Sequence, residues 1–320
     1  MSGRLATRSL TEGALLATVA VILALAGVYF PLLGTLALLA WPTPVMLAQM
    51  RQGMRLSLLT MAVTGVLLAS LVGPVPALAL VVPLGPLGIT MGEAFRRNLA
   101  PWPTLGVATA AALASQLAGF GVTLLLMGQN PIELYRSVFD QSIQMAGSLY
   151  GRMGLDTEAI LRPFQEQAAS LLGTLLPATL VVAAVMTAGI TYGISTLVLR
   201  RLGYRGEPFP PFARWQLPPH APLFYIAAVS LVYLDAGRGG PLHLVGANLA
   251  MITQLVFVVI GIAAIYWWLT RFGLSRVFRI VLMVYVFVFP VLVYAAMLMG
   301  LLDSLFDWRK LRVQKGEAGP

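Results

Sequence analysis

The amino-acid sequence predicts an all-α protein, a polytopic bundle of transmembrane helices, on two observations. Hydrophobic residues make up 58% of the 320 residues and charged residues only 10%, whereas roughly 25% of the residues of a typical soluble domain are charged. Apolar runs of about 20 residues, enough to cross a bilayer as a helix, recur between short breaks that carry Arg, Pro or Gly. The lipid bilayer is therefore the expected surroundings of most of the chain.

About nine spans are expected, and each is an apolar run that ends at charged or helix-breaking residues. They cover residues 10–29, 32–50, 56–72, 76–92, 104–127, 171–199, 221–235, 245–270 and 279–301. Ser9 and Glu12 have the spacing of a capping box, which predicts that the first helix begins at Leu10. The segment 221–235 is the shortest, and a re-entrant path there would lower the count to eight.

The longest extramembrane stretch is expected at residues 128–170, between spans five and six, and it carries five acidic residues and three Arg. Asn130, Pro131 and Glu133 are an N-cap, a first-position proline and an acid in the first turn, so a helix should start there. Its apolar residues recur at steps of three and four, at Ile132, Tyr135, Val138, Phe139, Ile143, Ala146 and Leu149. Asp156 and Glu158 open a second helix. Such helices either lie on the membrane surface or cover a cavity as a lid.

A proline-rich connection follows the sixth span and predicts a stiff linker. The expected organisation is a six-span bundle over residues 1–203, a cytoplasmic linker over 204–222 and a three-span unit with a short charged tail over 223–320. With the N-terminus inside, 13 of the 21 Lys and Arg residues fall in cytoplasmic breaks, as the positive-inside rule requires. Nine spans would nevertheless place the four basic residues of the tail outside.

The fourth span is rich in helix breakers, among them Pro83, Gly85, Pro86 and Gly88. A broken helix of this kind lines substrate sites in many transporters, and a kinked packing helix is the alternative. Small residues in the first helix form a further candidate site, a face for docking a partner, although intramolecular packing is the commoner use of such faces. These residues are Gly13, Ala17, Ala20 and Ala24.

Neutral polar residues within the spans are candidates for binding a small molecule, and the alternative for each is a hydrogen bond between neighbouring helices. The candidates are Gln116, Thr191, Tyr192, Asn248 and Gln254. Acidic and basic side chains do not occur in the middle of any of the expected spans, which argues against a proton-coupled pump.

Enzymatic function is not expected, because the sequence has no phosphate-binding loop, no HExxH motif and no Ser/His or paired-Asp arrangement within spans. Asp303 and Asp307 have a DxxxD spacing that some membrane prenyltransferases use, but Arg309 and Lys310 lie beside them and favour a solvated helix face. Without cysteine, and with only two His, no metal site or cofactor is expected. The net charge of +9 gathers at helix ends rather than on one face, so nucleic acid is not an expected partner.

Four short motifs stand out in the sequence, at Thr11–Ala17, Asn130-Pro131, Pro210–Trp215 and Gly300–Lys310. Together they resemble the YybS-like family of bacterial membrane proteins. That family is similar to the substrate-binding S components of energy-coupling-factor vitamin transporters, six-span proteins whose first helix docks on a transmembrane coupling subunit through an Ala-xxx-Ala face. Ala20 and Ala24 match that spacing, whereas the three spans after Arg205 depart from the S-component plan.

The resemblance implies a multi-pass protein of the bacterial plasma membrane, and the distribution of basic residues favours a cytoplasmic N-terminus. Its leading functional expectation is a small-molecule binding or transport protein that separate subunits energise through a transmembrane coupling subunit. A signalling or assembly scaffold without transport is the alternative, and a lipid-processing enzyme at Asp303 and Asp307 is a distant third. The sequence leaves the substrate, the partner and the side of the C-terminus open.

Overall fold

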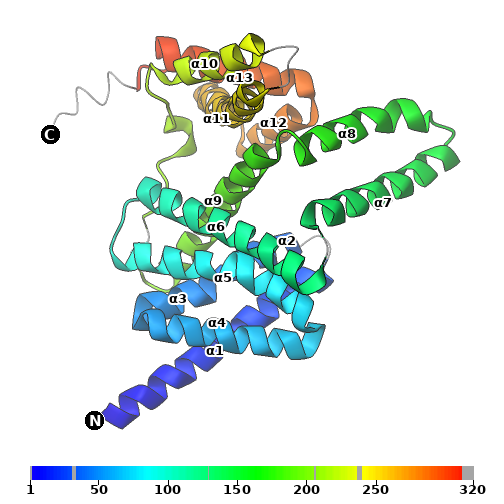
Figure 1. Ribbon diagram of the computed structural model, residues 1–320. Coiled ribbons are helices and arrows are strands. Elements are labelled where there is room, and N and C mark those ends of the chain that lie inside the picture. The colour runs from blue at the N-terminus through cyan, green and yellow to red at the C-terminus, as the bar shows by residue number, and fades with distance from the viewer. Residues whose placement is uncertain (1, 31–33, 129, 205–206, 236–239, 312–320) are drawn as a thin grey trace. The chain divides into compact units, whose positions relative to one another are not determined.

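The computed structural model describes residues 2–30, 34–128, 130–204, 207–235 and 240–311, and every regular element within these ranges is a helix (Figure 1). The predicted all-α class is confirmed. Six of these helices are long and apolar enough to cross a bilayer. They are α1 (Ser2–Tyr29), α4 (Met54–Val72), α5 (Pro74–Arg96), α6 (Pro101–Met127), α9 (Leu176–Arg201) and α11 (Pro241–Arg271).

The other three predicted spans are not single long helices. Residues 34–52 form α2 (Gly34–Ala40) and α3 (Pro42–Gln52), and α10 (Ala221–Leu234) has only 14 residues. The last predicted span is a pair, α12 (Arg276–Val288) and α13 (Pro290–Phe306), bent by 102°. Phe289 is extended because the following Pro290 disfavours helical geometry and lacks an amide donor. By length and composition the described residues give six spans, or seven with the bent pair as one, and the count of nine stays a prediction.

The chain divides into two compact units, each of which combines two stretches of sequence. Unit 1 is Met1–Ala168 with Leu180–Pro208, and unit 2 is Ala169–Thr179 with Phe209–Pro320. Helix α9 therefore begins in unit 2 and continues in unit 1. The predicted division into a bundle over residues 1–203, a linker over 204–222 and a unit over 223–320 stays a prediction.

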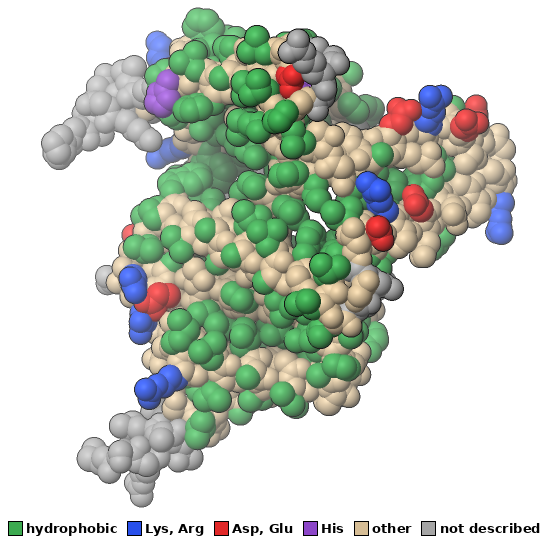
Figure 2. All heavy atoms as spheres, viewed as in Figure 1, with side chains coloured by type: hydrophobic (Ala, Val, Ile, Leu, Met, Phe, Trp, Pro, Cys, Tyr) green, Lys and Arg blue, Asp and Glu red, His purple; other side chains and the backbone are tan. Residues whose placement is uncertain are grey.

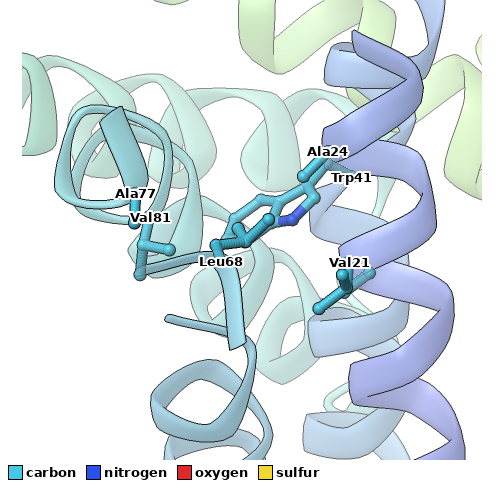
Figure 3. Packing of buried hydrophobic residues seen from close by; sticks show 7 residues of the cluster. Val21, Ala24, Trp41, Leu68, Ala77 and Val81 are labelled. Carbon is cyan, nitrogen blue, oxygen red and sulfur yellow. The ribbon is translucent and has the colours of Figure 1, made fainter. Parts of the chain in front are cut away.

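The core of unit 1 lies where α1, α4 and α5 meet around one tryptophan. Trp41, at the break between α2 and α3, is fully buried, and Leu68 and Val81 reach the same cluster from α4 and α5 (Figure 3). Helix α1 contributes Ala20 and Ala24, whose side chains are also fully buried. The small residues let the helix backbones approach closely, which is the usual basis of helix packing in membranes.

The glycines of α5 form a contact surface for α3, and the helix runs without interruption past Pro83 and Pro86. A Cβ atom added to Gly88 would lie 2.7 Å from the carbonyl oxygen of Pro42, and one added to Gly92 would lie 2.6 Å from that of Met46. Gly85 contacts the thioether of Met61 in the same way. Gly85 and Gly88 therefore lie against neighbouring helices, and a substrate site at this helix stays a prediction.

Two helices outside the candidate spans, α7 (Pro131–Arg152) and α8 (Thr157–Leu172), form the predicted amphipathic segment. The start of α7 is confirmed: Asn130 Oδ1 accepts a hydrogen bond of 3.0 Å from the Ile132 amide, and Pro131 is the first helical residue. Asp156 caps α8 by accepting from the Ala159 amide at 3.1 Å. The start predicted for the first helix is wrong, because α1 begins at Ser2.

Unit 2 is built on a close crossing of α11 and α13. Gly261 and Gly300 face each other across it, and a Cβ atom on either glycine would overlap the opposing backbone, at Ala296 for Gly261 and at Phe257 for Gly300. The short 3₁₀ helix η1 (Phe212–Arg214) packs on α11 beside this crossing, where Phe212 lies 6.2 Å from the ring of Tyr266.

Candidate functional site

The predicted ligand-binding residues of α9 are hydrogen-bonded to the chain itself. Thr191 Oγ1 donates to the carbonyl oxygen of Leu39 at 3.0 Å, and the Tyr192 hydroxyl donates to that of Glu207 at 2.5 Å. The ring of Tyr192 also stacks on Phe95 with centroids 5.2 Å apart. Both side chains are buried. They join α9 to its neighbours in unit 1, which is the packing alternative.

Asn248 is engaged in the same way within unit 2. Its Oδ1 accepts from the Ala178 amide at 2.8 Å, and its Nδ2 donates to the carbonyl oxygens of Thr174 and Leu244, each at 2.8 Å. Ala178 is the third residue of α9, and the first amides of a helix have no partner within the helix. Asn248 therefore caps the start of α9 from the side chain of another helix.

Gln116 differs from these residues, because its Oε1 is buried and has no hydrogen-bond partner in the described part of the chain. Gln254 is half-buried on α11. Gln116 belongs to unit 1, whereas Asn248 and Gln254 belong to unit 2. The polar pocket predicted from these three residues therefore stays a prediction.

The small residues of α1 lie inside unit 1. Ala17, Ala20 and Ala24 are fully buried, and a Cβ atom on Gly13 would lie 2.9 Å from Leu56 Cδ1 of α4. The face that was a candidate for docking a partner thus packs against the chain's own helices. A partner at this face would have to displace α4.

A group of polar side chains joins the helix ends on one rim of unit 1, and we call it the rim network. Gln49 is its centre: its Nε2 donates to Glu93 at 2.9 Å, and its Oε1 accepts from Ser57 at 2.7 Å. Glu93 also accepts from Arg96 and Arg97. The network ties α3 to the start of α4 and the end of α5.

The second half of the rim network brings α1 and the residues after α9 to the same rim. Glu12 pairs with Arg51 and accepts from Gln52 Nε2 at 2.7 Å, and Arg51 Nε donates to the Tyr204 hydroxyl at 2.6 Å. Ser9 donates to Gln52. The hydrogen bond to Glu12 raises the pKa of Arg51 above its usual value, so this cation stays charged. The spacing of Ser9 and Glu12 predicted a helix cap. Their side chains instead bind α3.

The most buried polar site is in unit 2, and we call it the linker clasp. Arg309 donates to both carboxylate oxygens of Asp303, at 3.0 and 2.6 Å, and the two side chains are 0% and 1% exposed. The same guanidinium donates to the carbonyl oxygens of Ala213 and Trp215 in the proline-rich segment, each at 2.7 Å. All of these bonds use the planar fork of donors that distinguishes Arg from Lys.

Asp307 completes the linker clasp, since it accepts from Gln216 Nε2 at 2.5 Å and from the Leu311 amide at 3.0 Å. Its backbone is left-handed, with φ of 47°, where α13 ends. The predicted solvated face at Asp303 and Asp307 is wrong, because Asp303 is buried against Arg309. The sequence signal that could have revealed this ion pair is the separation of Asp303 and Arg309 by six residues across the end of a helix. Pairs within one helix are separated by three or four residues.

Grooves on the surface of the described residues include one on the α7–α8 pair and one along α10. The first, of about 330 Å³, is lined among others by Gln144, Thr157 and Arg162, and the second follows Tyr225, Ser230 and Tyr233. The predicted ligand-binding residues line neither groove. In the view of Figure 2, hydrophobic side chains cover most of the visible helices, while many of the charged side chains lie on α7 and α8.

These features define a polytopic α-helical membrane protein whose polar side chains mainly join its own helices. The chain belongs to the family described as predicted membrane protein (DUF2232), whose model matches residues 18–304. It is 26% identical over 305 residues to the uncharacterized protein YybS of Bacillus subtilis (strain 168), which covers 95% of this chain and 98% of that protein. No solved structure matches the chain.

Proposed function

We propose that the chain is a non-enzymatic scaffold of the bacterial plasma membrane, which presents a rigid, proline-rich surface to a partner protein on the cytoplasmic side. The linker clasp is the observation that carries this proposal. A linker that only connects two helical units needs no fixed conformation. This linker is held by two hydrogen bonds from a single buried arginine, and two further bonds fix that arginine on Asp303.

The energetics of the linker clasp support a role beyond connection. Removing two charges from water costs several kcal/mol per ion, and the pair is retained only where its geometry and further hydrogen bonds offset that cost. In return the clasp fixes the backbone around Ala213, and Pro210, Pro211 and Arg214 remain exposed. A preorganised surface binds a partner with a smaller entropy loss than a flexible segment does.

We also propose the orientation of unit 1 from its rim network. The network gathers residues from the first half of α1, the ends of α3 and α5, the start of α4 and Tyr204 after α9. If all these residues lie on one side of the membrane, α1 must cross away from that side and α2 with α3 must cross back. Helix α4 then crosses away again, and α5 crosses back. Helices α6 and α9 then leave and return once more, which makes six passages.

Two contacts at opposite ends of α11 support two further passages in unit 2. Near its start, Asn248 bonds the first residues of α9, and near its end Tyr266 lies against Phe212 of the linker. On this basis we propose that α11 crosses toward the side of the linker and that α10 crosses in the opposite direction despite its short length. The proposed total is eight passages.

The bent pair α12 and α13 is proposed as a re-entrant hairpin rather than a span. Arg279, near the start of α12, lies 5.3 Å over the ring of Tyr266, and Arg309, after the end of α13, binds the carbonyl oxygens of the linker. Both ends of the pair are thus at the linker side. We therefore propose that the C-terminal side of α13 is cytoplasmic, unlike in the nine-span path.

The charge distribution supports this path. Where the structure describes the chain, fourteen Lys and Arg residues fall on the proposed cytoplasmic side and three, Arg136, Arg152 and Arg162, fall outside. The fourteen are Arg4, Arg8, Arg51, Arg55, Arg96, Arg97, Arg200, Arg201, Arg214, Arg271, Arg276, Arg279, Arg309 and Lys310. An excess of this kind is the positive-inside signature of short cytoplasmic loops.

The scaffold proposal is tested in living cells with a photo-crosslinking amino acid at Pro211 of the full chain. We expect a discrete adduct with one protein, and we expect that adduct to disappear when Arg309→Met releases the linker. The matched control is a crosslinker at Leu58, an exposed residue of α4, which should label lipid. Adducts at Pro211 that do not depend on Arg309, or none at all, would contradict the proposal.

A second candidate function, small-molecule binding or transport of the S-component kind through a coupling subunit, is supported by the unpaired oxygen of Gln116. An unsatisfied buried acceptor costs about 1–3 kcal/mol, which a ligand donor would recover. Native mass spectrometry of the purified chain tests it. A co-purified small molecule that is lost with Gln116→Leu and retained with Gln254→Leu would favour transport over the scaffold.

A further inference from the structure

Helix α7 carries an apolar stripe that neither α8 nor the rest of unit 1 covers. Val138, Met145 and Leu149 are 54%, 69% and 57% exposed, and Leu134 extends the row toward the start of the helix. At about 100° per residue, these four side chains lie within an arc of about 60°. In water such a stripe would expose contiguous apolar surface at a cost of about 25 cal/mol per Å².

The stripe is separate from the surface that α7 uses to pair with α8. That pairing surface centres on Gly147, where an added Cβ atom would lie 3.3 Å from Thr157 and 3.5 Å from Leu161. Leu161 is buried in the contact. The α7–α8 pair is therefore closed on one side while the stripe of α7 stays unpartnered.

Short linkers join both ends of the α7–α8 pair to candidate membrane spans. Helix α6 ends at Met127 and α7 begins at Pro131, while α8 ends at Leu172 and α9 begins at Leu176. Because α6 and α9 are candidate spans, linkers of only three residues keep the pair beside the headgroups. At about 1.5 Å per residue, α7 is about 33 Å long and can follow the membrane plane.

We propose that the stripe of α7 docks on the outer leaflet of the chain's own membrane, with Val138, Met145 and Leu149 buried at the boundary between headgroups and acyl chains. The occupant is lipid because the stripe continues from a membrane span. Amphipathic helices bind lipid in this way, and α7 has the polar face that the geometry requires, with Glu133, Arg136 and Asp140 exposed.

The charges of the pair define the lipid chemistry. Helices α7 and α8 with their connection carry five acidic residues and three Arg, unlike the Lys- and Arg-rich helices that anionic lipids attract. Docking is therefore driven by apolar burial. It persists on uncharged or zwitterionic surfaces and responds little to salt, because screening acts on charges alone.

The experiment uses the absence of cysteine in the chain. Met145→Cys and Leu149→Cys are labelled with an environment-sensitive fluorophore in the full chain, which is reconstituted into phosphatidylcholine vesicles with a doxyl quencher near the headgroup. The control is Asp140→Cys, which lies about 140° from Met145 around the same helix. We expect a blue-shifted emission at the two stripe positions and quenching about threefold stronger than at Asp140, unchanged by added phosphatidylglycerol or by salt.

Equal quenching at the stripe and at Asp140 would overturn the proposal. A blue shift at Met145 without lipid quenching would also overturn it, if the shift disappears when the protein is diluted to fewer than one copy per vesicle. In that case a second copy of the chain, not lipid, covers the stripe. The inference rests on α6 and α9 crossing the membrane and, for the choice of the outer leaflet, on the proposed orientation of unit 1. It does not rest on the scaffold function. The clasp-dependent adduct at Pro211 is a separate readout, so failure of one proposal is distinguishable from failure of the other.

Discussion

Breaking the linker clasp at Arg309 should destabilise unit 2 far more than removing the whole ion pair. Arg309→Met leaves Asp303 buried, charged and without its partner, and it leaves the carbonyl oxygens of Ala213 and Trp215 without their donor. The double variant, Asp303→Asn with Arg309→Met, keeps the shape of the carboxyl group and removes both charges. The two variants differ mainly in one uncompensated buried charge.

The magnitude follows from the burial of both side chains. Removing one partner of a buried ion pair costs about 3–5 kcal/mol, whereas replacing the whole pair is often neutral. The double variant still loses the hydrogen bonds to the two linker carbonyl oxygens. Each buried acceptor left without a donor costs about 1–3 kcal/mol. Because Arg309→Met also loses these two bonds, their cost cancels, and we expect Arg309→Met to be the less stable of the two by about 3–5 kcal/mol.

Two measurements on the purified chain in detergent check this expectation. Thermal unfolding of the two single variants and the double variant gives the coupling energy in a double-mutant cycle. Trypsin cleavage after the exposed Arg214 should accelerate in Arg309→Met, because the linker is released, while cleavage after Arg152 of α7 stays unchanged. Additive losses in the cycle, or equal cleavage after Arg214 in all variants, would refute a functional clasp.

Three further predictions concern helix crossings and topology. Gly300→Leu should cost about 3 kcal/mol, because the new side chain must separate α13 from the Phe257 backbone, whereas Gly106→Ala, which meets open space, should be nearly neutral in the same unfolding assay. Asn248→Leu should cost about 1–3 kcal/mol through the lost cap of α9, and Thr253→Val, which loses bonds only within its own helix, is the matched control. In intact cells, an impermeant thiol reagent should label Leu155→Cys and spare Lys310→Cys, and labelling of both would contradict the re-entrant α12–α13 pair.

Local features of the sequence predicted local structure well. The helical class and the long spans follow from apolar run length, and the start of α7 follows from Asn130 and Pro131, whose side chains act within one helical turn. The first helix shows the limit of such reasoning. Ser9 and Glu12 have capping spacing, yet α1 continues toward Ser2 and both side chains bind α3, because a partner from another helix competes with the local one.

Long-range partners could not be predicted from one sequence. Asp303 and Arg309 are close in the chain, but their burial depends on the linker, which lies some 90 residues earlier and supplies two carbonyl oxygens. Likewise the polar residues Thr191, Tyr192 and Asn248 have the composition of a ligand site and the contacts of helix packing. Side-chain type alone does not distinguish the two uses, since both require a hydrogen-bonding group inside an apolar bundle.

The linker clasp joins two motifs that are distant in the sequence. The motifs Pro210–Trp215 and Gly300–Lys310 contact each other through Arg309, and Gly300 within the second sets the crossing of α13 with α11. A change in either motif alone would leave unpaired carbonyls, an unpaired charge or a backbone clash at the other. Their joint presence is therefore a physical requirement of one fixed linker, and the exposed prolines that this linker presents are where a partner should be sought.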